Sequence, residues 1–532
     1  MSPRKLFSTT RNVMGWKNEL ILRSAAVALV GLLCQESRAL AAPRSGELEI
    51  KVIDATTKEP LACRMHLKNA RGRPRKLPKL PFLKDHVSFD GSLSMTLREG
   101  DYTFELECGP EYHTRMGHFS MERGGTDTKT VPMKRIVDMA AEGWWGGDLY
   151  VHRRVEDIPL LMRAEDLHVA QVVTWTDKKN DRPGKRQGQE LLTKFDTNRY
   201  YRILAGRDGR PSGGISIFHL EAPLLTLQSN HGATGEYPPG VKLAAEAQEN
   251  KNAWIEADTL VAQDLPLWIA HQRLDSVRLA NHRYTREGYI DEEPSDRPRD
   301  RTIYADAGGL GRWSNSIYYK LLESGLRIPP TAGSGSGDGP NPPGYNRVYV
   351  YCGKDFSYQR WWEGLRAGRV VVTNGPLLRP LVEGQRPGHV FKGEAGKTLH
   401  LQPEVKLATK DRIEYLEVVK NGRAASVVRL DDYVARKGRL PTLSFDSSGW
   451  FLIRAVTNAG KTYRFASTGP YYVEFPGEPR ISRTAVQFFC DWVDQRAASL
   501  EISDAEQAEE VQTLHRAARD FWQDLLGRAT TD

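Results

Sequence analysis

Residues 46–135 alternate apolar and polar side chains with the period of two that half-buried strands have. Leu48, Ile50 and Val52, for example, are separated by charged residues. Turn-forming segments rich in Asp, Gly and Pro interrupt the alternation, and no stretch with a helical period intervenes. A basic, Pro-rich segment over residues 71–84 indicates an exposed loop. We therefore expect a small β-sandwich over residues 46–135.

Residues 140–376 have a different pattern, in which short apolar strands alternate with helical stretches. The expected strands are 169–174, 214–218 and 253–258, with a strand and a turn over 368–376, and the expected helices are 155–167, 241–251, 314–324 and 356–367. Repeated strand-then-helix order predicts a parallel sheet or barrel, whose chemistry lies at the carboxyl ends of the strands. The long polar connections 177–195, 284–313 and 332–346 are expected to be loops over that face.

The remaining residues predict a second β-rich region and a helical tail. Residues 377–476 contain candidate strands at 399–407, 412–420 and 450–458, for which a second β-sandwich is the simplest arrangement. Residues 481–528 have an apolar stripe at helical spacing, and Ser503 with Glu506 has the spacing of a capping box. We expect this tail to pack on the body of the protein.

Residues 1–41 have the order of a secretory signal peptide: a basic leader, an apolar run over 24–33 and a small-x-small cleavage site at 39–41. The apolar run is too short for a permanent membrane span. This segment carries six of the 75 basic and two of the 67 acidic residues. The rest of the chain therefore has 69 basic and 65 acidic residues, a formal net charge of +4. Such a small excess of positive charge, without a row of basic residues interleaved with aromatic ones, does not indicate a nucleic-acid partner. The protein is expected to be exported, to the periplasm or beyond the cell.

Four cysteines lie beyond the leader, without a Cys-x-x-Cys pair that would indicate a zinc cage. Cys63 and Cys108 both fall on inward-facing positions of the first sandwich. A disulfide between them and two buried thiols are both compatible with this pattern.

The segment Gly143–Arg153 has the sequence GWWGGDLYVHR, in which Asp148, Tyr150 and His152 share one face of a strand. Together with residues 162–167 and 361–376, it resembles CehA/McbA-type metallohydrolases of the PHP superfamily over residues 140–380. Residues 46–135 resemble carboxypeptidase-regulatory or transthyretin-like modules.

The resemblance implies a PHP-like (β/α)7 barrel over residues 140–376, flanked by the two sandwiches and followed by the helical tail. It also implies a divalent metal, zinc, manganese or iron, held by His, Asp and Glu. A metal-activated water then attacks an ester-type bond in a phosphoester, a carbamate or a carboxylic ester, because the cation lowers the pKa of its bound water.

The site residues follow from this resemblance and from positions at strand ends. The expected metal ligands are Asp148, His152, His219, Asp258 and His282. The expected catalytic residues are Glu165, as a ligand or proton acceptor, and Tyr150, as a hydrogen-bond donor to the substrate or to the metal-bound water. Arg153 and Arg347 are candidates for clamping an anionic part of the substrate.

Two departures from the family pattern support a rival hypothesis. Tyr150 stands where the family has a histidine, and a neutral phenol is a poor metal ligand. The Gly-rich segment 332–338 contains no histidine where the family has a Gly-Ser-Asp-x-His motif. The rival is a catalytically inactive protein of PHP fold that has lost its metal and binds an extracellular glycan or surface partner. Two Trp pairs, at 144–145 and 361–362, could form an aromatic platform for a sugar or an aromatic substrate. We favour the alternative, that they pack in the core between the barrel and a sandwich.

Overall fold

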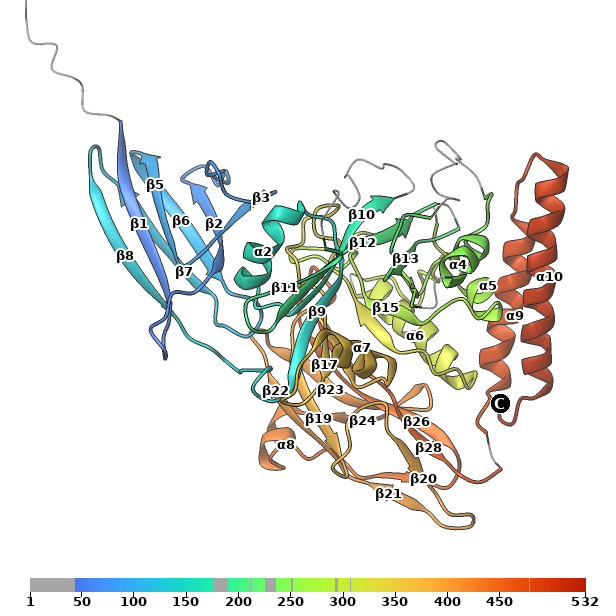
Figure 1. Ribbon diagram of the computed structural model, residues 1–532. Helices are drawn as coiled ribbons and strands as arrows, with labels where there is room; N and C mark the ends of the chain where they lie inside the picture. The colour runs from blue at the N-terminus through green and yellow to red at the C-terminus, as the bar shows by residue number, and fades with distance from the viewer. Residues whose placement is uncertain are drawn as a thin grey trace, which may run out of the picture.

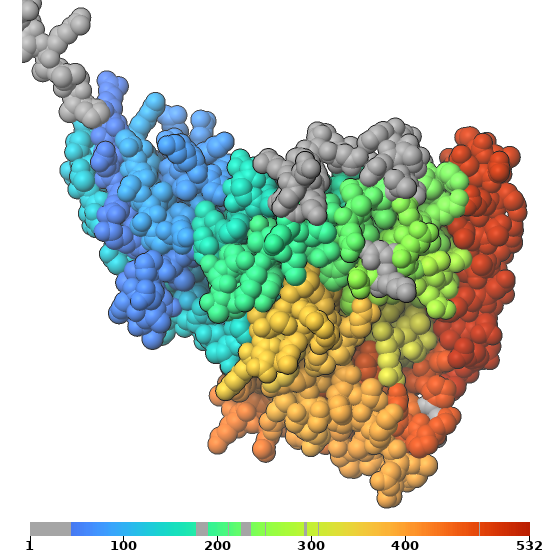
Figure 2. All heavy atoms as spheres, viewed as in Figure 1, coloured from blue at the N-terminus to red at the C-terminus, as the bar shows by residue number. Residues whose placement is uncertain are grey.

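The computed structural model describes residues 44–176, 190–210, 212–224, 236–249, 252–291, 295–306, 308–477 and 479–532. The expected signal peptide and most of the expected loop 177–195 lie outside these residues. The N-terminal sandwich lies at one end of the molecule and a pair of C-terminal helices at the other (Figures 1 and 2).

The N-terminal region consists of two sheets that pack face to face. One has the order β5-β1-β8 and the other β3-β4-β2-β6-β7. The strands are β1 Ser45–Asp54, β2 Cys63–Asn69, β3 Phe82–Leu83, β4 His86–Phe89, β5 Ser92–Arg98, β6 Gly100–Glu107, β7 Arg115–Met121 and β8 Thr126–Met133. The inward positions predicted from the alternation, including Leu48, Ile50 and Val52, are buried in one core. Cys63 and Cys108 are both buried there as free thiols.

The middle region begins a sixteen-stranded sheet whose first seven strands have the order β16-β15-β14-β13-β12-β10-β9. They are β9 Trp144–Val151, β10 Val169–Thr176, β12 Arg199–Asp208, β13 Ile215–Phe218, β14 Trp254–Ala257, β15 Ser276–Ala280 and β16 Pro330–Ala332, and β11 Leu192–Phe195 pairs with β12. The helical segments are η1 Val155–Asp157, α2 Ile158–Ala164, α4 Gly240–Glu249, α5 Leu265–Ala270, α6 Gly309–Glu323 and α7 Tyr358–Arg366.

This sheet differs from the expected parallel barrel in two respects. β13 runs antiparallel to both of its neighbours, β12 and β14. The described strands also form no closed barrel: β16 has only three residues, and the Gly-rich loop that follows reaches β9 through one isolated bridge, between Ser336 and Val151. A strand this short, followed by glycines, cannot form the ladder of hydrogen bonds that closure requires.

The same sheet continues beyond β9 with the order β17-β18-β27-β26-β23-β24, so strands of the C-terminal β-region are hydrogen-bonded to those of the middle region. These strands are β17 Arg347–Tyr351, β18 Val370–Thr373, β27 Phe465–Thr468, β26 Gly449–Thr457, β23 Ile413–Lys420 and β24 Arg423–Val428. Further elements are β19 Leu377–Val382, β20 Val390–Lys392, β21 Leu399–Leu401, β22 Pro403–Ala408, α8 Leu430–Ala435, β25 Leu443–Phe445 and β28 Tyr471–Glu474. Trp144, Trp145, Trp361 and Trp362 are all buried, as core packing predicts.

The tail forms two helices, α9 Arg483–Ala498 and α10 Ala505–Gly527, that pack on the middle region. The indoles of Trp492 and Trp522 donate to the carbonyls of Gln263 and Pro266 beside α5. The cap of α10 is Asp504, which accepts from the amide of Gln507, rather than the expected Ser503. No helix in the described part of the chain is both long and apolar enough to cross a membrane.

Candidate functional site

Two side chains at the end of β9 meet at the carboxylate of Asp338, which lies in the loop after β16. One oxygen of Asp338 accepts a hydrogen bond from the hydroxyl of Tyr150, and the other contacts Nδ1 of His152. Burial by itself raises the pKa of Asp338, but the contacts with His152 and Tyr150 outweigh it and bring the pKa to about 2. Asp338 is therefore an ionised carboxylate that orients both side chains.

The ring of Tyr150 is packed among cationic and aromatic groups. The guanidinium of Arg278 lies 4.9 Å from the ring centroid and that of Arg207 5.4 Å from it. The ring of His282 meets it edge-on at 5.7 Å. Burial raises the pKa of Tyr150 well above its ordinary value, so Tyr150 is a neutral hydrogen-bond donor, and in this structure it donates to Asp338.

Asp258, which follows β14, is fully engaged by neighbouring side chains. Its Oδ2 accepts from Nε of Arg207 at 2.5 Å, and its Oδ1 accepts from the hydroxyl of Ser216 at 2.5 Å and lies 3.0 Å from Nη1 of Arg278. Burial by itself would raise the pKa of Asp258, but the charges of Arg278 and Arg207 bring it below its ordinary value. Both oxygens of the carboxylate are therefore engaged by neighbouring side chains.

Arg278 also joins this cluster to Glu256, and both side chains are fully buried. Nε of Arg278 donates to Glu256 at 2.7 Å, and the hydroxyl of Ser276 donates to the other carboxylate oxygen at 3.0 Å. Burial raises the pKa of Glu256, and Arg278 opposes the increase. Arg207 and Arg278 thus hold the two buried carboxylates Asp258 and Glu256 beside Tyr150.

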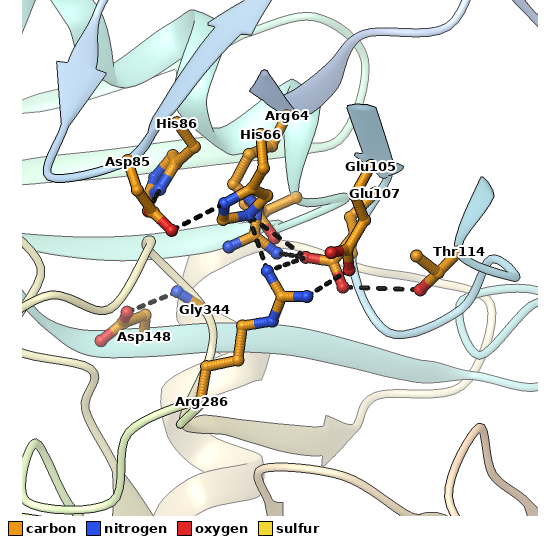
Figure 3. Close-up of polar contacts among 12 residues, drawn as sticks. Arg64, His66, Asp85, His86, Glu105, Glu107, Thr114, Asp148, Arg286 and Gly344 are labelled. Atoms are coloured by element: carbon orange, nitrogen blue, oxygen red, sulfur yellow. Dashed lines mark hydrogen bonds and ion pairs between the residues drawn. The ribbon is translucent and has the colours of Figure 1, made fainter. Parts of the chain in front are cut away.

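Asp148 is buried and binds main-chain amides instead of pointing into an open site. Its Oδ1 accepts from the amides of Tyr150 and Ser334 at 2.9 and 3.0 Å, and its Oδ2 accepts from the amide of Gly344 at 2.6 Å (Figure 3). Its role in this structure is to anchor the Gly-rich loop to β9.

Residues 332–336 of the Gly-rich loop are buried, Gly337 and Asp338 are exposed, and the loop is tightly packed against the site. A Cβ on Gly333 would lie 2.7 Å from Cβ of Tyr150, and one on Gly335, whose φ is +63°, would lie 2.6 Å from Cβ of His282. Gly337, with φ +103°, passes so close to His152 that a Cβ would lie 1.9 Å from its carbonyl oxygen. The glycines allow the chain to pass between the side chains of the cluster.

His219 lies elsewhere, at the opposite edge of the sheet. Because β13 is antiparallel, its carboxyl end points away from the ends of β9, β14 and β15. The ring of His219 contacts the carbonyl of Asn252 at 3.2 Å and the hydroxyl of Tyr358 at 2.9 Å. Burial lowers its pKa to about 4. The structure does not bring His219 together with the other expected ligands.

Glu165 and Arg347 lie at the junction with the N-terminal sandwich. Glu165 is buried with its Oε1 3.2 Å from Nε of Arg64, and its carbonyl oxygen accepts from Arg347 at 3.1 Å. Burial raises the pKa of Glu165 to about 7. Neither side chain contacts the cluster around Asp338.

Beside the cluster lies a groove of about 510 Å3. One wall is the loop 76–83 of the sandwich, and the other is formed by residues 152–154, Asp157 and Gly337. The wall residues include Lys76, Lys79, Arg153 and Arg154 against one carboxylate, Asp157. Arg153, one of the two expected anion-binding residues, thus lines this groove.

The residues of the expected metal site do not fit a divalent cation. In the described part of the chain, His152, Asp258 and His282 are not part of any group of three ligand atoms close enough to share an ion. The carboxylate oxygens of Asp148 and Asp258 are already occupied by amides and guanidinium groups. Two fixed positive charges, Arg207 and Arg278, would also repel a cation placed beside Tyr150.

Within the described ranges, one group of three has ligand atoms within 4.8 Å of one another: His66, Asp85 and His86 on the sandwich. Nδ1 of each histidine lies 3.0 Å from an oxygen of Asp85 (Figure 3). Nη1 of Arg286 lies 2.9 Å from Nε2 of His66. Because a guanidinium can only donate, Nε2 is the acceptor and the proton of neutral His66 is on Nδ1, directed at Asp85. In this arrangement Nδ1 of His66 is therefore not available to a metal.

Sequence reasoning missed Arg207, Arg278 and Asp338. Arg278 is flanked by Val277 and Leu279 inside an apolar strand, and a charged residue in such a position is a signal that could have indicated a buried ion pair. Asp338 ends the Gly-Ser repeat, which was interpreted only by its missing histidine and not by the carboxylate that it contains.

Comparisons with known proteins give no assignment. No protein family model and no curated protein matches the chain. Among solved structures, the TIE protein of Bacillus anthracis is 24% identical over 21% of this chain and 20% of its own, with a TM-score of 0.14. A pilus-presented adhesin is 15% identical over 18% of this chain and 28% of its own, with a TM-score of 0.14. β-Glucuronidase 3 of Bacteroides uniformis is 10% identical over 81% of this chain and 64% of its own, with a TM-score of 0.15. The chain thus spans about a fifth of the TIE protein and under a third of the adhesin, and these similarities are too low to indicate a shared fold.

Proposed function

We propose that this chain is an exported binding protein, catalytically inactive as a metallohydrolase, that holds an anionic glycan in the groove beside His152. One observation carries the first part of this proposal: the guanidinium groups of Arg207 and Arg278 lie against Tyr150 and bind Asp258. They provide fixed positive charge where the CehA/McbA resemblance implies a metal ion.

Electrostatics explains why this exchange favours binding over metal-dependent hydrolysis. A guanidinium neutralises a buried carboxylate and donates hydrogen bonds in a fixed geometry. It cannot lower the pKa of a bound water as a divalent cation does, since it has no open coordination position. A site whose positive charge comes from guanidinium groups is therefore suited to holding a ligand and not to activating water.

The nature of the ligand follows from the groove. Its volume of about 510 Å3 is in the range of small-ligand pockets. Four Lys and Arg side chains face one carboxylate, and neither Lys76 nor Lys79 forms an ion pair within the described ranges. Pro81, Phe82 and Leu83 add an apolar strip along the same wall. Charged and apolar surfaces side by side suit a uronic-acid or sulfated oligosaccharide.

The metal-dependent hydrolase implied by the resemblance is the competing proposal, and metal content distinguishes the two. Residues 42–532 would be purified without chelator and analysed by mass spectrometry, beside His152→Ala. We expect no metal above the background of the variant, even after incubation with zinc, manganese or iron. Near-stoichiometric metal that disappears in His152→Ala would overturn the binding proposal.

The ligand is tested by titrating the same protein with acidic and neutral oligosaccharides of equal length in a calorimeter. We expect binding only of the acidic ones. Lys79→Glu should weaken it roughly tenfold or more, whereas Lys129→Glu, on the far strand β8, should leave it unchanged. Equal affinity for neutral sugars, or an equal loss in both variants, would contradict the proposal.

A further inference from the structure

A second cavity, of about 80 Å3, lies where the three regions of the chain meet. Arg64 and Glu107 line it from the sandwich, Glu165 and Arg347 from the middle region, and Lys410 from the C-terminal β-region. Figure 3 shows Arg64, Glu107 and Gly344 near this junction. One water needs roughly 10–15 Å3 of such space, so the cavity has room for several waters or for one small ion.

The charges around this cavity are predominantly positive. Five cationic side chains line it, Arg64, Arg286, Arg347, Lys410 and Arg464, against three carboxylates, Glu107, Glu165 and Asp411. Glu105, just outside, pairs with Arg286, which brings the count to five against four. The surplus is reinforced by Glu165, because burial raises its pKa to about 7 and part of its population is uncharged at neutral pH.

Two of the cations bind main-chain oxygens rather than carboxylates. The buried guanidinium of Arg347 donates to the carbonyls of Gly344 and Glu165, at 2.5 and 3.1 Å. Nζ of Lys410 donates to the carbonyl of Gly109 at 2.9 Å. In the described part of the chain, neither has a carboxylate oxygen within 4.0 Å. Their charges are therefore available to a ligand in the cavity.

Arg64 provides a separate indication of a missing partner. Its side chain is only 6% exposed, and its Nη2 and Nε lie on Glu107 and Glu165. Its Nη1 is buried and has no hydrogen-bond partner among the described residues. A buried charged donor without an acceptor costs free energy, and an ion in the adjoining cavity would satisfy it.

We propose that this cavity binds a small oxyanion, inorganic phosphate or sulfate, between Arg64, Arg347 and Lys410. The ion would accept from Nη1 of Arg64 and would link the sandwich to the other two regions. Such a site lies apart from the groove of the proposed function and does not depend on it. Its size admits a free ion and excludes a phosphorylated sugar.

The test uses the full mature chain and inorganic phosphate, with chloride of matched ionic strength as the reference. A ligand that binds the folded state raises the melting temperature with concentration. We expect a saturable increase with phosphate that Lys410→Gln weakens roughly tenfold. Arg71→Gln, in the exposed loop of the sandwich, should respond as the parent does. Lys410 is exposed, so its substitution should leave folding intact.

A second variant and a second ligand sharpen the result. Glu165→Gln removes a negative charge beside the cavity and should tighten phosphate binding, which a purely structural role of Glu165 would not do. Phenyl phosphate should bind far more weakly than phosphate. The proposal is overturned if phosphate has no effect beyond that of chloride, if Lys410→Gln responds as the parent does, or if phenyl phosphate binds equally well.

Discussion

Arg286 donates a hydrogen bond of 2.9 Å to Nε2 of His66, from a loop after β15 to the outer face of the N-terminal sandwich. The same guanidinium forms an ion pair with Glu105. His66 in turn contacts Asp85 (Figure 3). A connected set of polar contacts, from Arg286 through His66 to Asp85, therefore crosses the boundary between the two regions. This contact decides which nitrogen of His66 carries the proton, and with it whether the histidine pair can bind metal.

Arg286→Met should create a zinc site at His66, Asp85 and His86. Without the guanidinium, Nδ1 of His66 can lose its proton and the local positive charge is removed, so zinc affinity should increase roughly tenfold or more. Competition with a chromophoric zinc chelator measures the change. His66→Ala in the Arg286→Met background should abolish it. Tight, His66-dependent zinc binding by the parent protein would show that the tautomer assignment is wrong.

Arg278→Met should be strongly destabilising, by about 3–5 kcal/mol, because it leaves the buried carboxylates of Glu256 and Asp258 without their shared partner. Chemical denaturation followed by tryptophan fluorescence measures the loss. Adding Glu256→Gln should recover part of it, since one of the unpaired charges is then gone. Arg516→Met, on the exposed face of α10, should stay within about 0.5 kcal/mol of the parent. A similarly small loss of stability for Arg278→Met would contradict the claim that Arg278 neutralises these two buried carboxylates.

Glu165 should make the protein less stable as the pH rises from 5 to 8. Its pKa is about 7 in the folded chain against 4.5 when unperturbed, so the folded state binds the proton more tightly. Its contribution is fully present below pH 4.5 and is lost as the pH passes 7, a change of roughly 3 kcal/mol. Melting temperatures at pH 5 and pH 8 measure it. Glu165→Gln should lessen the difference, and an unchanged profile would refute the assignment.

Gly337→Ala should disrupt the loop that carries Asp338. The position has φ +103°, and a Cβ there would lie 1.9 Å from the carbonyl oxygen of His152. The backbone must move, at a cost of roughly 1–3 kcal/mol for the strain alone. Gly72→Ala is the matched control, because its φ is +72° but no atom lies within 4 Å of the added Cβ. Hydrogen exchange of residues 333–339 should increase in the first variant and stay unchanged in the second.

The sequence by itself determined the local structure. The alternation around Leu48 predicted the strands of the sandwich and their buried face, and the strand-helix order predicted most elements of the middle region. The spacing of Tyr150 and His152 predicted that both side chains would point to one place, and they meet at Asp338. Such features depend on residues near one another in the chain, where the periods of strand and helix decide which side a residue faces.

Only the tertiary structure decided which other residues surround Tyr150 and His152, and so what their site can bind. The direction of β13 depends on its pairing with β12 and β14, and it sends His219 to the opposite edge. Arg207 and Arg278 lie in β12 and β15 and Asp258 follows β14, and nothing in their local sequence indicates that they will share one buried cluster. Glu165 and Arg64 meet only because the sandwich docks on the middle region. Charges far apart in the chain acquire partners through packing, and those partners decide whether the site holds a metal, an anion or neither.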